Sequence, residues 1–165
     1  MWLFRPVRLA ESRGPREFIR RVLLQQFLVK VLVAVPIALL VPQDAVGQSQ
    51  FIREDPIFAI VAILLFAPVI ETLVLQGAMI EPLRLFRRSR LVQFIAGAVP
   101  FAALHFFDGI HAGVAAGVVG GIYFSHTYLE CRARSWWAAT KFTTMTHFLH
   151  NLIVAPFALG FALLS

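Results

Sequence analysis

One carboxylate, two imidazoles and one carboxamide stand inside otherwise apolar stretches of this 165-residue sequence. They belong to Glu71, His105, His147 and Asn151. Removal from water disfavours the ionised form of a carboxyl group, and such a group suits a general base that works near neutral pH. An imidazole can hold a water molecule against that base, and donors from His147 and Asn151 can stabilise a developing oxyanion. Together these groups predict a water-activating hydrolytic centre.

The composition places this centre in a membrane. Hydrophobic residues make up 59% of the chain and charged residues only 15%, whereas soluble domains carry about 25% charged residues. A soluble domain of this length could not bury so much apolar surface, because its surface-to-volume ratio limits burial. The excess must face lipid, so we expect an integral membrane protein.

Five apolar stretches can each supply a membrane-spanning helix, since a span needs about 20 residues. They cover residues 22–41, 57–80, 91–107, 109–129 and 136–164. The last is long and contains Pro156, so it is either one kinked helix or a span with a short final segment. The fold class we expect is an all-α, polytopic transmembrane bundle of about five or six spans. Residues 1–21 form its basic N-terminus and residues 22–165 a single bundle.

Arginine clusters between the apolar stretches predict the topology. They comprise Arg5, Arg8, Arg13, Arg16, Arg20 and Arg21, then Arg84, Arg87, Arg88 and Arg90, then Arg132 and Arg134. By the positive-inside rule the N-terminus and residues 81–90 and 131–135 are cytoplasmic, and residues 42–56 are external. We therefore expect a multi-pass protein of the plasma membrane, the inner membrane in a bacterium. Charge clustered in this way argues against a nucleic-acid partner.

Depth in the membrane brings the four candidate residues together. Most charged residues lie at span edges, and we take Glu71 and the histidines as the exceptions. At about 1.5 Å per residue from the predicted cytoplasmic edge, Glu71 lies about 20 Å deep and His105 about 21 Å. His147 lies about 18 Å deep and Asn151 about 24 Å. Polar side chains from three helices therefore reach one level.

The remaining histidines and a stripe of glycines have simpler explanations. His126 falls near the inner edge and His111 near the outer edge, so both are expected at the interface. His150 lies about 100° around its helix from Asn151, and we expect it to be structural. Gly113, Gly117 and Gly121 form two small-xxx-small steps, which allow close helix packing.

The order Glu, Phe-x-x-x-His, His-x-x-x-Asn on successive spans resembles the CAAX-protease and bacteriocin-processing family of intramembrane glutamic-type endopeptidases. The second motif is Phe101-Ala102-Ala103-Leu104-His105, and the third is His147-Phe148-Leu149-His150-Asn151. The resemblance covers about residues 57–156. It implies that Glu71 is the catalytic base, aided by His105. It also implies an oxyanion role for His147 and Asn151, with Phe101 supporting the site by packing.

The first motif departs from the family pattern. That pattern is Glu-Glu-x-x-x-Arg, and this chain has Glu71-Thr72-Leu73-Val74-Leu75-Gln76. Both members of an i,i+4 ion pair are replaced together, by Thr72 and Gln76, which could still share a hydrogen bond. Loss of one charge would leave the other buried and unpaired, whereas loss of both is balanced. We expect a compensated variant that keeps its base.

The function we expect is hydrolysis of a peptide bond in a membrane-associated protein or peptide precursor. The alternative is a non-catalytic peptide-binding, scaffold or immunity-type membrane protein of the same fold. A proton-coupled carrier would also use a buried acid and histidine, but the chain shows no inverted repeat.

Cofactors and partners follow from the same residues. The resemblance implies that no metal is needed, although Glu71, His105 and His147 could instead bind zinc. The single Cys131 excludes an intrachain disulfide and a cysteine-rich metal site. The expected partners are the membrane-associated protein or peptide substrate and the lipid bilayer.

Overall fold

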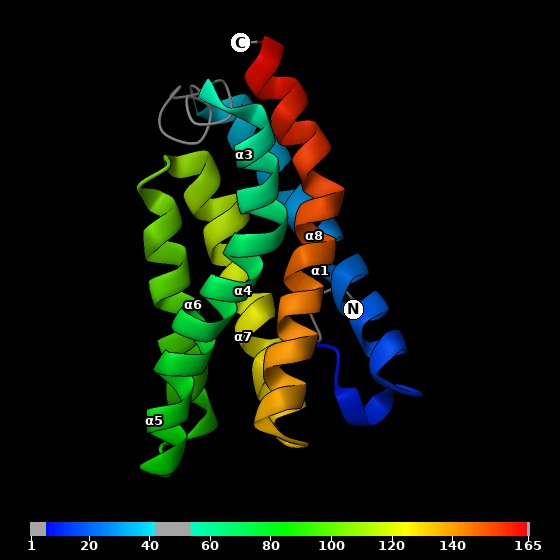
Figure 1. Cartoon of the computed structure of the whole chain (residues 1–165), viewed down its shortest axis with the longest axis vertical. Coiled ribbons are helices and arrows are strands. Elements are labelled where there is room, and N and C mark those ends of the chain that lie inside the picture. Colours follow the sequence, from blue (N-terminus) through cyan, green and yellow to red (C-terminus); the bar gives the residue numbers. More distant parts are fainter. Residues whose placement is uncertain (1–5, 42–53, 165) are drawn as a thin grey trace.

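The computed structural model describes residues 6–41 and 54–164, with side chains described up to residue 156, and every element in this part is a helix (Figure 1). Five helical rods form, and they coincide with the five predicted apolar stretches. The elements are η2 (Leu9–Glu11), α1 (Pro15–Leu40), α3 (Pro56–Val61), η3 (Ala62–Phe66), α4 (Ala67–Glu71), η4 (Thr72–Ala78), α5 (Met79–Leu85), α6 (Arg90–Phe106), η5 (Ala112–Val118), α7 (Val119–Arg132) and α8 (Trp136–Leu164). The predicted all-α fold is confirmed.

The second rod, Pro56–Leu85, runs from α3 to α5 and is called the α3–α5 rod below. It contains two π-helical segments, η3 and η4, in which the backbone bonds i to i+5. Pro68 and Pro82 each remove an amide donor from this rod. In a regular α-helix each donor would have bonded to the carbonyl four residues earlier, and these positions lie inside η3 and η4. Glu71 stands between the two wide segments and is the last residue of α4.

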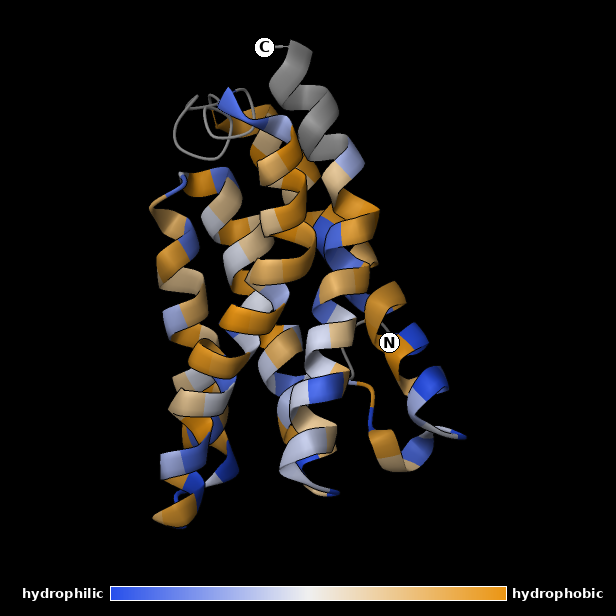
Figure 2. Cartoon of the chain, viewed as in Figure 1, coloured by the Kyte–Doolittle hydropathy of each residue, from blue (hydrophilic) through white to orange (hydrophobic). Residues whose placement is uncertain are grey.

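The apolar surface of the bundle faces outward. Leu39, Leu85 and Phe107 are about four-fifths exposed, and Figure 2 shows hydrophobic residues along most of the length of the helices. Among the described residues, two rods are long and apolar enough to cross a membrane, Pro15–Leu40 and Pro56–Leu85, and Arg90–Phe106 is a shorter apolar helix. These features agree with a membrane helical bundle. The number of crossings and their direction stay predictions, and the expected external segment lies almost wholly outside the described residues.

The glycine stripe packs against α6. A side chain at Gly117 would meet the Ala102 carbonyl oxygen at 2.9 Å and the His105 Cβ at 2.8 Å. At Gly121 it would meet the Ala98 carbonyl oxygen at 2.6 Å. Contacts this short do not occur between real atoms of these kinds, so the prediction of close packing at this stripe is confirmed. The stripe thereby allows α6 to lie close to the rod formed by η5 and α7.

The segment before α1 is part of the core. Val7 and Leu9 are buried in one cluster with Phe18 and Tyr128. The His126 Nε2 lies 2.7 Å from the Val7 carbonyl oxygen. Because that oxygen can only accept, the imidazole donates to it. The first residues of the described chain therefore hold α1 against α7.

A charged network joins the rods at their arginine-rich end, the lower end of Figure 1. The guanidinium of Arg132 donates to both carboxylate oxygens of Glu81, at 2.7 and 3.0 Å. The Tyr128 hydroxyl donates to the same carboxylate at 3.0 Å. The Arg90 side chain pairs with Glu130. These contacts fix α5 and α6 against α7, and so orient the α3–α5 rod that carries Glu71.

Candidate active site

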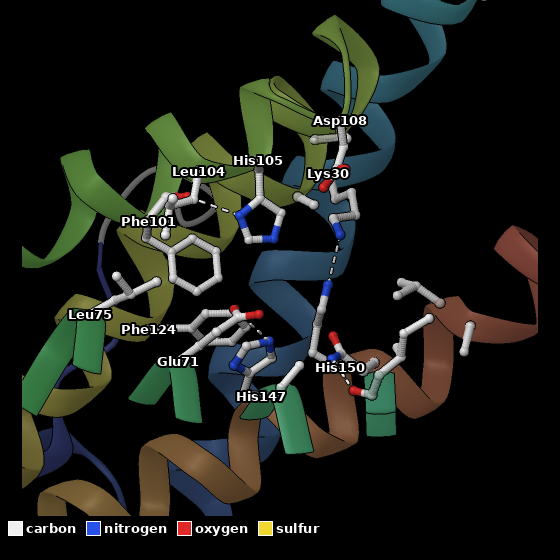
Figure 3. A pocket seen from close by; sticks show the side chains of 18 of the residues that line it. Lys30, Glu71, Leu75, Phe101, Leu104, His105, Asp108, Phe124, His147 and His150 are labelled. Carbon is white, nitrogen blue, oxygen red and sulfur yellow. Dashed lines mark hydrogen bonds and ion pairs between the residues drawn. The ribbon is translucent and has the colours of Figure 1, made fainter. Parts of the chain in front are cut away.

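A cavity of about 380 Å³ lies inside the bundle, and all four predicted catalytic side chains line it (Figure 3). Glu71 comes from α4, His105 from α6, and His147 and Asn151 from α8. Alanine, leucine and isoleucine side chains form much of the remaining wall. The cavity size is that of a small-molecule or short-peptide site. The sequence predicted that these four side chains lie at a similar depth, and in the structure they line the same cavity.

Glu71 and His147 face each other across the cavity. The Glu71 Oε2 lies 3.8 Å from the His147 Nε2, which is longer than a hydrogen bond. That oxygen is buried and has no hydrogen-bond partner among the described residues. The His147 side chain is also buried. The pair thus presents an acceptor and an imidazole nitrogen side by side.

Two phenylalanines hold the imidazoles in place. Phe101 stacks on His105 with ring centroids 4.6 Å apart. Phe124 stacks on His147 with ring centroids 4.1 Å apart. The two phenylalanine rings meet edge to face at 5.4 Å, a favourable arrangement of aromatic rings. Phe101 was predicted as a supporting residue, but Phe124 was not, because one phenylalanine in an apolar helix carries no distinguishing pattern.

The tautomer of His105 follows from its backbone contact. Its Nδ1 lies 2.9 Å from the carbonyl oxygen of Phe101, one helical turn earlier. A carbonyl oxygen only accepts, so Nδ1 carries the hydrogen. In the neutral ring Nε2 is then an acceptor, and Figure 3 shows this side of the ring turned into the cavity. His105 can therefore accept a hydrogen bond from a water molecule.

Asn151 binds the backbone of the α3–α5 rod. Its Nδ2 donates to the Ile63 carbonyl oxygen at 2.8 Å. In this π-helical turn the Ala67 N–H bonds to Ala62 instead. The residue five positions beyond Ile63 is Pro68, which has no N–H to offer. The Asn151 carboxamide supplies the donor that Pro68 lacks, and its Nδ2 has a second N–H for another acceptor.

The hydrogen bond expected between Thr72 and Gln76 is not present. Both side chains are fully buried, and the Thr72 hydroxyl and both Gln76 amide atoms have no partner among the described residues. Both residues lie in the π-helical segment η4, and neither side chain directs its polar atoms to the other. Neither side chain lines the cavity.

Lys30 is a cavity residue that was not among those predicted from the sequence. Lys30, from the middle of α1, lines the cavity, and its Nζ lies 2.7 Å from the His150 Nε2. The expectation that only Glu71 and histidines are ionisable inside spans was therefore wrong. Lys30 interrupts a long apolar stretch, the same signal that singled out Glu71. His150, expected to be structural, and His111, expected at the outer edge, also line this cavity.

The three side chains considered as zinc ligands do not converge. Among the described residues, no three His, Cys, Asp or Glu side chains come close enough together to hold one metal ion. Glu71, His105 and His147 face one cavity but do not meet at a common point of ligation. We therefore derive no step through a metal, and metal independence stays a prediction.

Comparison with known proteins gives one match. The model of a protein family described as "Type II CAAX prenyl endopeptidase Rce1-like" matches residues 53–153. This range includes Glu71, His105, His147 and Asn151, and it agrees with the span over which the resemblance was predicted. No curated protein and no solved structure matches the chain.

Proposed function

This chain belongs to the type II CAAX prenyl endopeptidase Rce1-like family, and from that premise we propose that it is an intramembrane endopeptidase whose general base is Glu71. Membership of this family supports peptidase activity in general. The substrate that we propose is a membrane-associated protein or peptide precursor in the plasma membrane. The observation that supports the mechanism is the pairing of Glu71 and His147 across a cavity inside the bundle.

The attacking water would be held by two acceptors. The buried Glu71 Oε2 has no hydrogen-bond partner among the described residues, and the His105 Nε2 is an acceptor because its Nδ1 donates to Phe101. A water molecule has two hydrogens to give to these two groups. Bound in this way, it directs its lone pair toward a substrate carbonyl, and Glu71 takes the proton as the bond forms.

The oxyanion that forms would be stabilised from α8. His147 and Asn151 are four residues apart, so they lie on one face of this helix. The His147 Nε2, when protonated, and the second N–H of Asn151 can both donate to the developing charge. Such donors typically contribute about a hundredfold to a thousandfold each in rate. Glu71 then returns its proton to the leaving amine, which completes the cleavage of the peptide bond.

The decisive experiment compares membrane proteins in cells that carry the wild-type chain or Glu71→Gln. We expect at least one shortened membrane protein that is present only with the intact carboxylate. Glu17→Gln is a matched control, because this carboxylate lies in the first turn of α1, outside the cavity. An identical set of shortened proteins in wild-type and Glu71→Gln cells would contradict the role of Glu71. Binding of peptide without cleavage by the wild-type chain would favour the scaffold alternative.

A further inference from the structure

Lys30 is the cation on the wall of the active-site cavity, and no other lysine or arginine among the described residues lines it. It lies in the 26-residue helix α1, outside the range that matches the family. Figure 3 shows its ammonium group directed toward His150, on the side of the cavity away from Phe101. An ionisable side chain held inside a spanning helix is costly and indicates a function.

The charge of Lys30 is not neutralised by its partner. Its Nζ lies 2.7 Å from the His150 Nε2. An ammonium group only donates, so Nε2 accepts, and His150 is the neutral tautomer with its hydrogen on Nδ1. Asp108 lines the same cavity, but no ion pair joins it to Lys30 in the described part of the chain. The ammonium has three hydrogens, so two remain for another acceptor.

We propose that Lys30 and His150 form a subsite that binds a carboxylate of the substrate. This inference rests on the proposed function of Glu71 and His147. A carboxylate supplies the negative charge that the ammonium lacks, and a charge-assisted hydrogen bond of this kind is strong in a site with apolar walls. Apolar side chains, among them Ile60, Leu104 and Val154, form other parts of the cavity wall.

The position of the subsite limits where the carboxylate lies on the substrate. His150 follows His147 by three residues on α8, a rise of about 4.5 Å. An extended peptide advances about 3.3 Å per residue. The bound carboxylate therefore lies about one or two residues from the bond that is cut. It belongs either to the free C-terminus of the substrate or to an aspartate or glutamate side chain.

Three probe peptides separate these sources. Each is an N-terminally acylated, fluorescein-labelled tetrapeptide: Gly-Val-Ala-Leu with a free C-terminus, the same peptide as its C-terminal amide, and Gly-Val-Asp-Leu amide. Binding is measured by fluorescence polarisation on purified Glu71→Gln protein in detergent. We expect at least a tenfold preference for one of the two carboxylate peptides over the neutral amide. The preferred peptide identifies the source of the carboxylate.

Variants of Lys30 test whether this side chain provides the preference. In the same background, Lys30→Met should bind all three peptides equally weakly, and Lys30→Arg should keep much of the preference because the charge remains. Lys141→Met removes an exposed lysine of α8 and should behave like its parent. Equal binding of the three peptides to the parent, no binding of any, or a preference that survives Lys30→Met would overturn the subsite.

The assay separates this inference from the proposed function. Binding to the Glu71→Gln protein does not require catalysis. A carboxylate preference without cleavage by the wild-type chain would contradict the proposed peptidase activity and support the carboxylate subsite. Cleavage with the same KM for acid and amide peptides would support the proposed peptidase activity and contradict the carboxylate subsite. If both hold, Lys30→Met raises KM for the preferred peptide at least tenfold and leaves KM for the neutral amide close to the wild-type value.

Discussion

Asn151 donates to the Ile63 carbonyl oxygen at 2.8 Å, at the point where Pro68 leaves that carbonyl without a backbone donor. One carboxamide therefore compensates for a proline on another rod. The contact holds α8 against the α3–α5 rod, and these are the two elements that bring His147 to Glu71. Asn151, which is proposed to stabilise the oxyanion, therefore also helps to set the distance between Glu71 and His147.

The first prediction concerns this compensation. Asn151→Ala should lower the free energy of unfolding by about 1 kcal/mol, because the partly buried Ile63 carbonyl loses its donor. Pro68→Ala restores a backbone N–H near that carbonyl. In the Pro68→Ala background, Asn151→Ala should therefore cost about 1 kcal/mol less. Thermal unfolding of the four proteins in detergent measures the coupling, and strictly additive changes in stability would contradict it.

The second prediction separates the chemistry of His105 from its packing. His105→Phe keeps an aromatic ring against Phe101 and removes the nitrogen acceptor. Turnover should fall about a hundredfold, the usual contribution of an acid–base group, while Tm changes little. His126→Phe should do the reverse, because His126 binds the Val7 backbone and lies outside the cavity. Equal losses of turnover in the two variants would contradict a specific role for His105.

The third prediction concerns metal. Purified protein should keep its kcat/KM after treatment with EDTA or 1,10-phenanthroline, because the proposed steps use only side chains of this chain. Loss of activity that added zinc restores would give Glu71, His105 and His147 the role of ligands. A structural change caused by the chelator would appear as a shift in Tm, which serves as the control.

The fourth prediction concerns the buried polar atoms of η4. Thr72→Val and Gln76→Met should leave stability unchanged or raise it by about 1 kcal/mol, because each removes polar atoms that lack a partner. Thermal unfolding in detergent is the measurement. The charged substitutions Thr72→Glu and Gln76→Arg should each be harmful, because each buries an unpaired charge. Together they should be additive, since the Thr72 and Gln76 side chains make no hydrogen bond to each other in this structure. Recovery in the charged double variant would show that the side chains meet.

The fifth prediction concerns topology. A reporter inserted after Arg88 should be cytoplasmic, because arginines flank this short connection. A reporter within residues 43–50, which lie outside the described part of the chain, should be external. If both reporters lie on the same side, the α3–α5 rod does not cross the membrane. The depth of Glu71 counted from the cytoplasmic edge would then be wrong.

The sequence was sufficient to predict that Glu71, His105, His147 and Asn151 come together, but not how they are held. Glu71, His105 and His147 could be matched by depth, because helices of constant rise place residues at levels that can be counted. Counting cannot detect a change of helix type, so the π-helical segments η3 and η4 were missed. Pro68 and Pro82 were the available signals, since each disrupts regular α-helical bonding. Lys30 was missed although it obeyed the rule that identified Glu71.

The close approach of Gly117 to His105 links two positions that serve different purposes. The Cβ of His105 lies 2.8 Å from where a side chain at residue 117 would begin. Even one methyl group there would push α6 away from η5. Every residue except glycine carries a Cβ at position 105, and the Ala102 carbonyl oxygen lies 2.9 Å from the same point. The need for glycine therefore comes from the close approach of the two helical backbones and not from the imidazole. A related chain with a larger residue at position 117 would hold these two rods further apart, and its residue 105 would be displaced with α6.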